Sequence, residues 1–377
     1  MLTTKITIIG AGFAALTAIK TLRKRSKTVE ITLIAPKAEF IYMPSLIWIP
    51  SGKRSADDLR IDLGSFFSKN TIKFHAGTVK SIKDGGRTVV TENGEITNDA
   101  LLVASGGRFI KKLAGIEHTI TLCEGIAAAE KMRDQVKALQ GGTIALGFGG
   151  NPKEPSAMRG GPMFELLFGL DTQLRQENRR DQFKLIFFSP SPQPGKRLGD
   201  GAVDAILAEM KKRGIETHLG HKMKGFETDK VLTEGGEIET DLIIFMPGMT
   251  GPSFTAQSPF PLSSGGLIKA DKHCKVTTLE QVYVAGDSGS FPGPAWQPKQ
   301  AHMADLQAVA AVNNLMDAFE GKPASHTFKF ELICIIDSLT KGSFVFRNEK
   351  RTFMLPPLRL LHFSKQFFEW WYLRGYR

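Results

Sequence analysis

The stretch KITIIGAGFAALTAIKTLRKRSKTVEITLIA, residues 5–35, decides the fold of this chain. Its β-branched opening, residues 5–9, predicts a buried strand, and the apolar spacing over residues 14–25 predicts a helix. A second buried strand is expected over residues 29–34. This order of strand, glycine turn, helix and strand is typical of a dinucleotide-binding unit. A glycine turn in another kind of α/β protein is the competing interpretation.

Three small residues give this turn its expected role. Gly10 permits the sharp turn, Gly12 lets the backbone approach a pyrophosphate, and Ala15 fills the place where the helix lies against the sheet. The helix N-terminus would face the anion, because its first N–H groups carry partial positive charge. These three residues are therefore candidate cofactor contacts.

The end of the second strand lacks the carboxylate that usually holds the ribose of NAD. It reads Ala35-Pro36-Lys37, so a ribose contact is expected from backbone groups at Ala35 or from Glu39. The run that follows, residues 39–51, is aromatic and interrupted by prolines, which predicts a loop rather than a regular helix. A helix is then expected over residues 56–68, followed by several short strands.

Two remote segments indicate which dinucleotide is bound. LLVASGG, residues 101–107, and VYVAGDS, residues 282–288, each read as a short apolar strand that ends in a glycine turn. They resemble the ATG-like and GD motifs of two-dinucleotide flavoproteins, in which the aspartate, here Asp287, meets the ribityl chain of FAD. The resemblance implies FAD as the cofactor. Further implied contacts are Ser105, Gly106, Gly286 and, where the proline-interrupted loop packs near the isoalloxazine edge, Pro44.

Composition and charge limit the class of protein. The chain has 377 residues, of which 42% are hydrophobic and 23% charged, so it can form two domains with full cores. The formal net charge of +11 favours anionic partners. No nucleic-acid motif accompanies it, and the basic clusters at residues 23–25 and 211–213 lie at expected helix ends, so we expect no nucleic-acid partner.

Targeting and metal signals are absent from the sequence. Met1 leads directly into the first strand, and no apolar run reaches the length of about 18 residues that a membrane-spanning helix needs. We therefore expect a cytoplasmic location. The three cysteines are too few and too scattered for a disulfide framework or a metal cluster, so no metal is expected.

A second Rossmann-like unit is expected inside the first. A helix over residues 125–139 leads to the strand GGTIALGFGG, residues 141–150. Pro152, Pro155 and Pro162 follow, and they prevent a helix from starting directly after the glycine turn. We therefore expect this unit to keep the fold but to lose the pyrophosphate site. Its other elements are expected to be helices over residues 163–176 and 201–213 and strands over residues 183–188 and 242–246.

These elements predict an α/β protein with two Rossmann-like dinucleotide-binding domains, in which a degenerate NAD-type domain interrupts the FAD-binding domain. The expected boundaries are residues 1–112 and 247–330 for the two parts of the FAD-binding domain and residues 113–246 for the second domain. Residues 331–377 are expected to form a strand pair and an amphipathic tail.

Over residues 1–347 the chain resembles the sulfide:quinone oxidoreductase and flavocytochrome c sulfide dehydrogenase flavoproteins. The resemblance rests on the first glycine turn, the GD turn, GPMFE at residues 161–165, QPKQAH at residues 297–302 and LICIID at residues 332–337. It implies an enzyme that oxidises sulfide or a related sulfur species and reduces a quinone. It also implies a catalytic ammonium at Lys299, where a preset cation would meet charge that develops on the reduced flavin. A surface lysine is the alternative.

The same resemblance implies two redox cysteines beside the flavin, and only one is present. Cys334 matches the second cysteine, whereas Arg159 stands where the first is expected, six residues before Glu165. Without the pair no internal disulfide can form and exchange with sulfide. A Cys334 thiolate would still bind sulfur, and Arg159 would hold an anionic substrate such as a sulfur oxyanion or a carboxylate.

Two more residues are implied at the site by the resemblance. Cys123 matches a third family cysteine near the flavin, and Glu165 is expected to relay protons. The alternatives stay open for each residue. Cys334 would then be a packing residue, Arg159 a loop arginine, and Glu165 a helix-start carboxylate that stabilises the helix dipole.

The C-terminal stretch, residues 356–377, is rich in aromatic residues. Its apolar side chains alternate with Arg359, His362, Lys365 and Arg374, so a helix here would place a wide aromatic face between cationic flanks. Such a helix is too short to span a bilayer and would rest on its cytoplasmic side as a peripheral, monotopic anchor, where it would admit a quinone. A dimer interface or a helix docked on the body is the alternative, so a homo-oligomer stays a candidate partner.

Two other functions remain open at this point. A type II NADH:quinone oxidoreductase would need an intact nucleotide turn in the second domain, which the prolines oppose. A flavin-binding sensor without sulfide turnover would fit the replacement of the first cysteine by Arg159.

Overall fold

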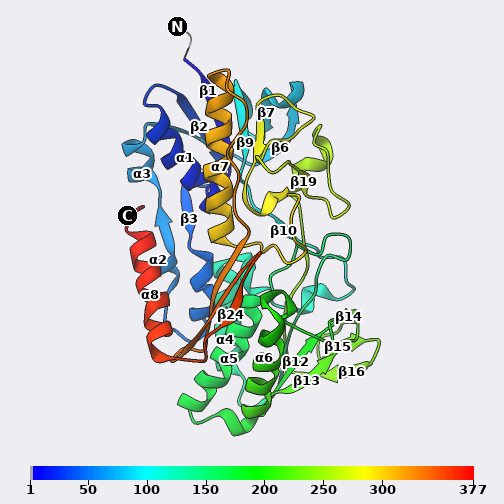
Figure 1. Cartoon of the computed structure of the whole chain (residues 1–377). Helices are drawn as coiled ribbons and strands as arrows, with labels where there is room; N and C mark the ends of the chain where they lie inside the picture. The colour runs from blue at the N-terminus through cyan, green and yellow to red at the C-terminus, as the bar shows by residue number, and fades with distance from the viewer. Residues whose placement is uncertain (1–2) are drawn as a thin grey trace.

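The computed structural model describes residues 3–377, and its two parallel sheets lie in the upper and lower halves of Figure 1. The upper sheet has the strand order β20-β9-β1-β2-β5, and every neighbouring pair in it is parallel. Its strands are β1 (Lys5–Ile9), β2 (Glu30–Ala35), β5 (Ile72–Ala76), β9 (Ala100–Val103) and β20 (Val282–Val284). Both segments of the chain that flank the second unit therefore contribute to one sheet.

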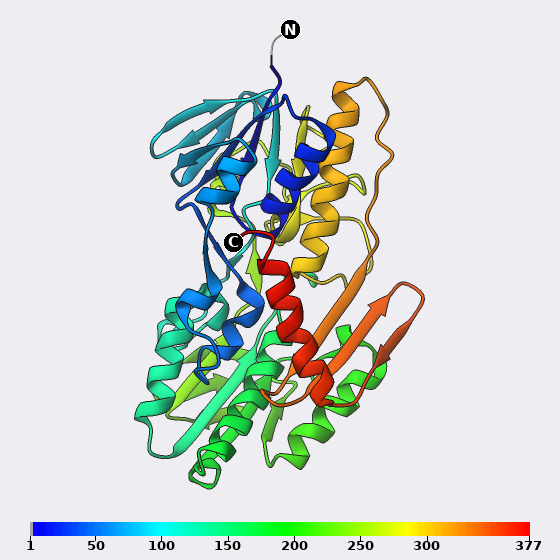
Figure 2. The same ribbon diagram turned by 90° about the vertical axis from the view of Figure 1, so that its left-hand side faces the viewer.

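Helix α1 (Phe13–Arg25) packs beside α7 (Ala301–Phe319) against this sheet, as Figures 1 and 2 show. Alanine, leucine and isoleucine side chains at helical spacing form the buried face of α1, and this burial stabilises the helix more than its intrinsic propensity does. Ala15 is completely buried there, as expected for a small residue between helix and sheet. The predicted strand, helix and strand of residues 5–35 are confirmed within a residue or two.

The lower sheet has the strand order β13-β12-β11-β17, again entirely parallel. It was expected from the fresh strand after residue 140, and the α/β class with two Rossmann-like sheets is confirmed. Its strands are β11 (Gly142–Phe148), β12 (Phe183–Ser189), β13 (Glu216–Leu219) and β17 (Leu242–Met246). Its helices are α4 (Ile126–Ala138), α5 (Gly161–Gln176) and α6 (Asp200–Lys212).

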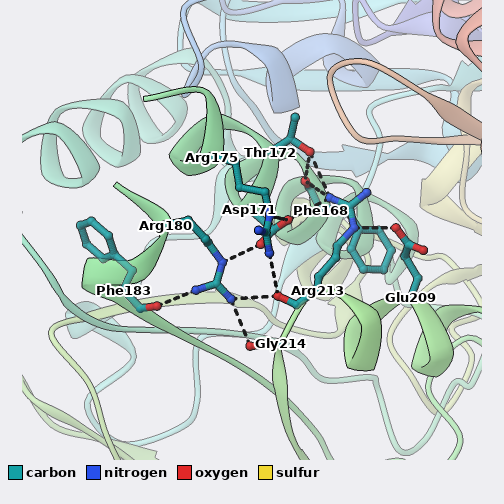
Figure 3. Close-up of polar contacts among 9 residues, drawn as sticks. All are labelled: Phe168, Asp171, Thr172, Arg175, Arg180, Phe183, Glu209, Arg213 and Gly214. Carbon is teal, nitrogen blue, oxygen red and sulfur yellow. Dashed lines mark hydrogen bonds and ion pairs between the residues drawn. The ribbon is translucent and has the colours of Figure 1, made fainter. Parts of the chain in front are cut away.

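A buried carboxylate joins the elements of this lower unit (Figure 3). Asp171 of α5 is fully buried and accepts hydrogen bonds from Arg175 Nε at 3.0 Å, Arg180 Nε at 2.6 Å and Arg213 Nη1 at 3.0 Å. Arg213 also donates to Glu209 of α6 at 2.6 Å. Arg180 precedes β12 and Arg213 ends α6, so one side chain connects three segments. These charged groups pair with one another within the unit, and we assign them a structural role.

The proline-interrupted run differs from the loop that was predicted. It forms a short strand β3 (Glu39–Ile41) and a 3₁₀ helix η1 (Met43–Trp48) with Pro44 in its first turn. Proline is tolerated there because the first N–H groups of a helix have no partner within it. The apolar side chains of η1 are buried, so this segment belongs to the core.

The single helix predicted over residues 56–68 is wrong. The structure has α2 (Ala56–Leu59), a strand β4 (Arg60–Asp62) that pairs with β3, and α3 (Gly64–Lys69). A capping box between Ser55 and Asp58 starts α2, and pairing with β3 then ends it after one turn. A tertiary contact has overridden helix propensity here.

Smaller sheets complete the molecule, and all of them are antiparallel except the parallel pair of β19 and β21. The predicted strand pair near the C-terminus is a three-stranded sheet of β22 (Glu331–Asp337), β23 (Gly342–Asn348) and β24 (Thr352–Met354), and it leads into α8 (Arg359–Leu373). The remaining strands are β6 (Val79–Lys83), β7 (Thr88–Thr91), β8 (Gly94–Thr97), β10 (Arg108–Phe109), β14 (Met223–Phe226), β15 (Lys230–Thr233), β16 (Gly236–Glu239), β18 (Met249–Thr250), β19 (Ile268–Lys269) and β21 (Gly289–Ser290).

Candidate active site

Three glycine turns meet at the carboxyl edge of the upper sheet. Gly10 adopts a φ of 111°, and a Cβ there would lie 2.4 Å from the carbonyl oxygen of Ala104, so the first turn touches the turn after β9. Ser288, after β20, donates from its hydroxyl to the carbonyl of Gly106 at 2.8 Å. The hydroxyls of Ser105 and Ser288 lie 3.4 Å apart. Ligands of open α/β sheets bind at this edge.

The first turn is open in the way that a pyrophosphate requires. A Cβ on Gly12 or on Gly106 would meet no described atom within 4 Å. No side chain of residues 3–377 caps the N-terminus of α1, and its first turn carries no acidic residue. The uncapped N–H groups and the positive end of the helix dipole therefore point at this turn. These residues fit the diphosphate of a dinucleotide cofactor.

The corresponding turn of the second unit differs from the first in its packing and in the element that follows it. A Cβ on Gly147 would lie 2.5 Å from the ring of Phe188, and one on Gly149 would lie 3.2 Å from the ring of Phe245. The next helix, α5, begins only at Gly161, as the prolines predicted. Side chains of the protein therefore occupy the space beside these glycines, and no helix N-terminus faces the turn.

Two other predicted contacts lie along β2 and η1. Ala35 ends β2, and its carbonyl accepts a hydrogen bond from the Gly77 N–H at 3.0 Å. Glu39 lies in β3 with its carboxylate 3.9 Å from Arg60 Nε. Pro44 is half-buried at the start of η1.

Asp287 and Arg159 form an ion pair inside the site. Asp287 is only 8% exposed at the turn after β20, and the guanidinium of Arg159 binds its carboxylate. Arg159 lies in a loop, and this ion pair holds its side chain. Cys123 lies beside the same guanidinium; burial raises the pKa of its thiol, and Arg159 only partly opposes that rise.

Lys299 lies next to this pair. Its ammonium donates to the carbonyl of Gly289, and burial lowers its pKa to about 8, against the opposing effect of Asp287. Arg197 of the second unit donates to the carbonyls of Trp296 and Gln297, and so fixes the segment that leads to Lys299. A cation is therefore held within the protein rather than on the surface.

Cys334 and Glu165 form a second group. Cys334 lies in β22, where a Cβ on Gly161 would be 3.9 Å from its sulfur. Burial, reinforced by Glu165, raises the pKa of Cys334 to about 12, so its thiol carries a proton at neutral pH. The thiolate that the resemblance implies at Cys334 would therefore need a base nearby. All three cysteines are free thiols, and Cys123 and Cys334 are not joined.

The carboxylate of Glu165 raises the pKa of two thiols, those of Cys123 and Cys334. Glu165 is 6% exposed in α5, and burial raises its pKa to about 7 although the ammonium of Lys365 binds its carboxylate. Its charge acts on Cys123 as well as on Cys334. Burial alone would lower the pKa of Lys365, but Glu165 and the neighbouring Asp337 raise it, so the ammonium stays charged. Glu165 can therefore take up or release a proton near neutral pH.

Two residues of α8 lie in positions that differ from the sequence prediction. His362 and Lys365 were expected on the cationic flanks of the tail, but both point into the body. His362 Nδ1 lies 2.5 Å from Asp337 Oδ2, and Lys53 Nζ lies 2.6 Å from His362 Nε2. The missed signal is the spacing of the polar residues 362, 365 and 369, which places them on one helix face among aromatic residues.

The opposite face of α8 is exposed and apolar. It consists of Leu360, Phe363, Phe367, Phe368, Trp370 and Trp371, each more than half exposed. Figure 2 shows α8 lying along the outside of the molecule, across both halves. A contiguous apolar patch of this kind marks an interaction surface, and the amphipathic tail is confirmed. Within residues 3–377 no helix has the length and hydropathy to cross a bilayer.

Comparisons with known proteins agree with this architecture. The sulfide-quinone reductase of Aquifex aeolicus is 24% identical, and the match covers 98% of this chain and 90% of that protein. The type II NADH:quinone oxidoreductase of Staphylococcus saprophyticus is also 24% identical, over 87% of this chain and 85% of its own.

A solved structure matches the whole fold. The X-ray structure of the sulfide:quinone oxidoreductase from Aquifex aeolicus superposes with a TM-score of 0.90 at 22% identity, covering 100% of this chain and 92% of that one. A family model, described as pyridine nucleotide-disulphide oxidoreductase, matches residues 4–308. Because that match spans most of the sequence, the chain belongs to the pyridine nucleotide-disulphide oxidoreductase family of flavin-dependent oxidoreductases.

Proposed function

We propose that this protein is an FAD-dependent oxidoreductase that takes electrons from a small sulfur compound and passes them to a membrane quinone. The proposal of FAD as the cofactor rests on one observation. Three glycine turns meet at one sheet edge, and a Cβ on Gly12 or Gly106 would meet no neighbouring atom there. The N-terminus of α1 would hold the diphosphate, and Asp287 would hold the ribityl hydroxyls. Bound FAD would supply two-electron transfer. In this proposal residues 1–112 and 247–330 form the cofactor domain, and residues 113–246 form the second domain.

On the donor side, Cys334, Glu165 and Lys365 would handle the sulfur compound. The Cys334 thiol is uncharged at neutral pH, so it would react only when a base takes its proton. Glu165 has a pKa of about 7 and lies beside this thiol, which makes it the fitting base. Lys365 would hold the carboxylate in place and stabilise its charged form.

On the acceptor side, the exposed face of α8 favours a lipid-soluble oxidant. Both relatives described above are quinone oxidoreductases. Aromatic side chains, tryptophan above all, are enriched at the depth of lipid headgroups. A helix lying in that layer would bring the site next to a quinone dissolved in the bilayer, with the protein held peripherally on the membrane.

A type II NADH:quinone oxidoreductase is the second candidate, because a relative of equal identity has that activity. The turn after β11 opposes it, since α5 begins only at Gly161 and no helix N-terminus faces the turn to hold a pyrophosphate. A flavin-binding sensor without turnover is the third candidate, favoured by Arg159 in place of a cysteine.

Stopped-flow absorption of the flavin band separates the three candidates. Sulfide is expected to bleach the FAD-loaded protein, whereas NADH is expected to leave it oxidised. Bleaching by NADH alone would favour the second candidate, and bleaching by neither donor would favour the third. Cys334→Ser should abolish reduction by sulfide with FAD still bound, and Cys274→Ser, which removes a buried thiol elsewhere, serves as the matched control.

A further inference from the structure

An excess of positive charge surrounds Lys299. Burial is the main cause of its lowered pKa, and Arg159 and Arg197 lie close enough to lower it further, while Asp287 and Glu154 oppose them. Three cations and two carboxylates therefore lie near one another, and the three cationic side chains are partly buried. A local excess of cations in such a place attracts an anion.

Two guanidinium N–H groups in this cluster lack an acceptor. The Nε atoms of Arg159 and Arg197 are buried, and neither has a hydrogen-bond partner among the described residues. Buried donors in folded proteins nearly always have partners, and a charged donor without one loses its hydration without compensation. The cluster therefore has unused capacity to bind an acceptor.

Arg159 is only partly buried. Its Nε is buried, but 22% of the side chain remains exposed, whereas the carboxylate of Asp287 is only 9% exposed. One Nη of Arg159 binds Asp287, which fixes the guanidinium and orients its remaining donors. Cys123 lies beside it.

Arg197 reaches the cluster from the second unit. It lies in η6 (Lys196–Leu198), where Arg347 of β23 donates to its carbonyl at 2.9 Å. Its own side chain holds the carbonyls of Trp296 and Gln297, directly before the turn that carries Lys299. Its charge is thus fixed at the cluster by backbone contacts on both sides.

We propose that Arg159, supported by Arg197 and Lys299, is the binding site for a small sulfur anion, such as hydrosulfide or a sulfur oxyanion, which serves as the electron donor. This proposal rests on the proposed function and names its substrate class. A guanidinium offers paired donors to an anion, where a second cysteine would offer a disulfide partner. Arg159 would therefore select a charged donor held by hydrogen bonds.

Anion binding to the FAD-loaded protein tests this directly. Isothermal titration with thiosulfate, hydrosulfide and sulfate, on protein whose flavin has first been reduced photochemically so that no electron transfer adds heat, would give three dissociation constants. Arg159→Met is expected to weaken binding of the preferred anion at least tenfold, and Arg159→Lys, which keeps the charge but loses the paired donors, by less. Arg351→Met removes the same charge from an exposed position and should change nothing.

The relative affinities for the three anions show which kind of anion the site binds. Tight binding of sulfate and thiosulfate indicates an oxyanion site, and binding of hydrosulfide alone indicates a site for the smaller ion. Absence of binding by all three, or equal binding by Arg159→Met and the unchanged protein, would overturn the proposal. Flavin content, read from the absorption spectrum of each variant, separates this result from failure of the proposed function. Arg159-dependent binding with no flavin reduction by sulfide would leave the anion site standing and refute sulfide as the donor.

Discussion

The ion pair between Glu165 and Lys365 allows a quantitative test of how α8 is attached. Glu165 is 7% and Lys365 13% exposed, so the pair is shielded from solvent, and it joins α5 to the tail 200 residues later. Lys365→Met leaves the carboxylate buried beside Asp337 and Cys334 without its cation. Breaking a buried pair from one side typically costs about 3–5 kcal/mol, and we expect a loss of that size in the free energy of unfolding.

A double-mutant cycle isolates the pair from other effects of the substitution. Glu165→Gln combined with Lys365→Met removes both charges, so the double variant should be more stable than Lys365→Met alone, with a coupling of about 2 kcal/mol. The assay is urea unfolding at pH 8 followed by tryptophan fluorescence, since Trp48 lies 5.4 Å from the Lys365 ammonium. The exposed pair of Lys83 and Glu95 is the matched control, and its cycle should show no measurable coupling.

The pH dependence of the free energy of unfolding is a second test of the environment of Glu165. Its pKa of about 7 in the folded protein lies above the ordinary 4.5, so the folded state holds the proton more tightly than the unfolded state. This contribution to stability is fully present below pH 4.5 and is lost as the pH rises through about 7. Glu165→Gln should remove that decline. Zero coupling in the cycle, together with an unchanged pH profile in Glu165→Gln, would refute a buried pair at this position.

Other predictions concern the fold, the membrane and the cofactor. Asp171→Asn removes the charge that three guanidinium groups share and should lower the free energy of unfolding by about 3–5 kcal/mol in urea titrations. Phe367→Ser combined with Trp371→Ser should abolish co-sedimentation with anionic vesicles at an unchanged melting temperature, because both side chains are exposed. Gly10→Ala should impair folding through its contact with a backbone carbonyl, whereas Gly12→Ala should fold normally and lose bound flavin, as measured by its absorption.

The structure of residues 5–35 was predictable because residues close together in the sequence determine it. A buried strand, a glycine turn and an apolar helical spacing lie next to one another in the sequence, and each favours the same unit. The absence of a helix directly after β11 followed from the same kind of argument, since proline acts on its own backbone and on the residue before it. Residues 56–68 show where prediction from local sequence fails, because the strand there forms only by pairing with residues 39–41.

The partners within the site could not be predicted, because they depend on contacts between remote segments. Arg159 and Asp287 are 128 residues apart, and nothing near either residue indicates the pair. The same holds for the protonation of Cys334, which follows from burial against α5 and from the nearby carboxylate of Glu165. Composition alone made the tail lysine and histidine look like solvent-facing charges.

The contacts of α8 link its proposed membrane contact to its proposed place beside the sulfur site. A helix that served only as an anchor would need no buried charges, because a buried ion pair adds little net stability over apolar packing. The pairs of Lys365 with Glu165 and of His362 with Asp337 instead fix one rotation of the helix, since a shift of one residue turns every side chain by about 100°. That rotation alone directs Phe367 and Trp371 outward. The charged side chains that hold α8 beside Cys334 thus also direct the aromatic face of this helix outward.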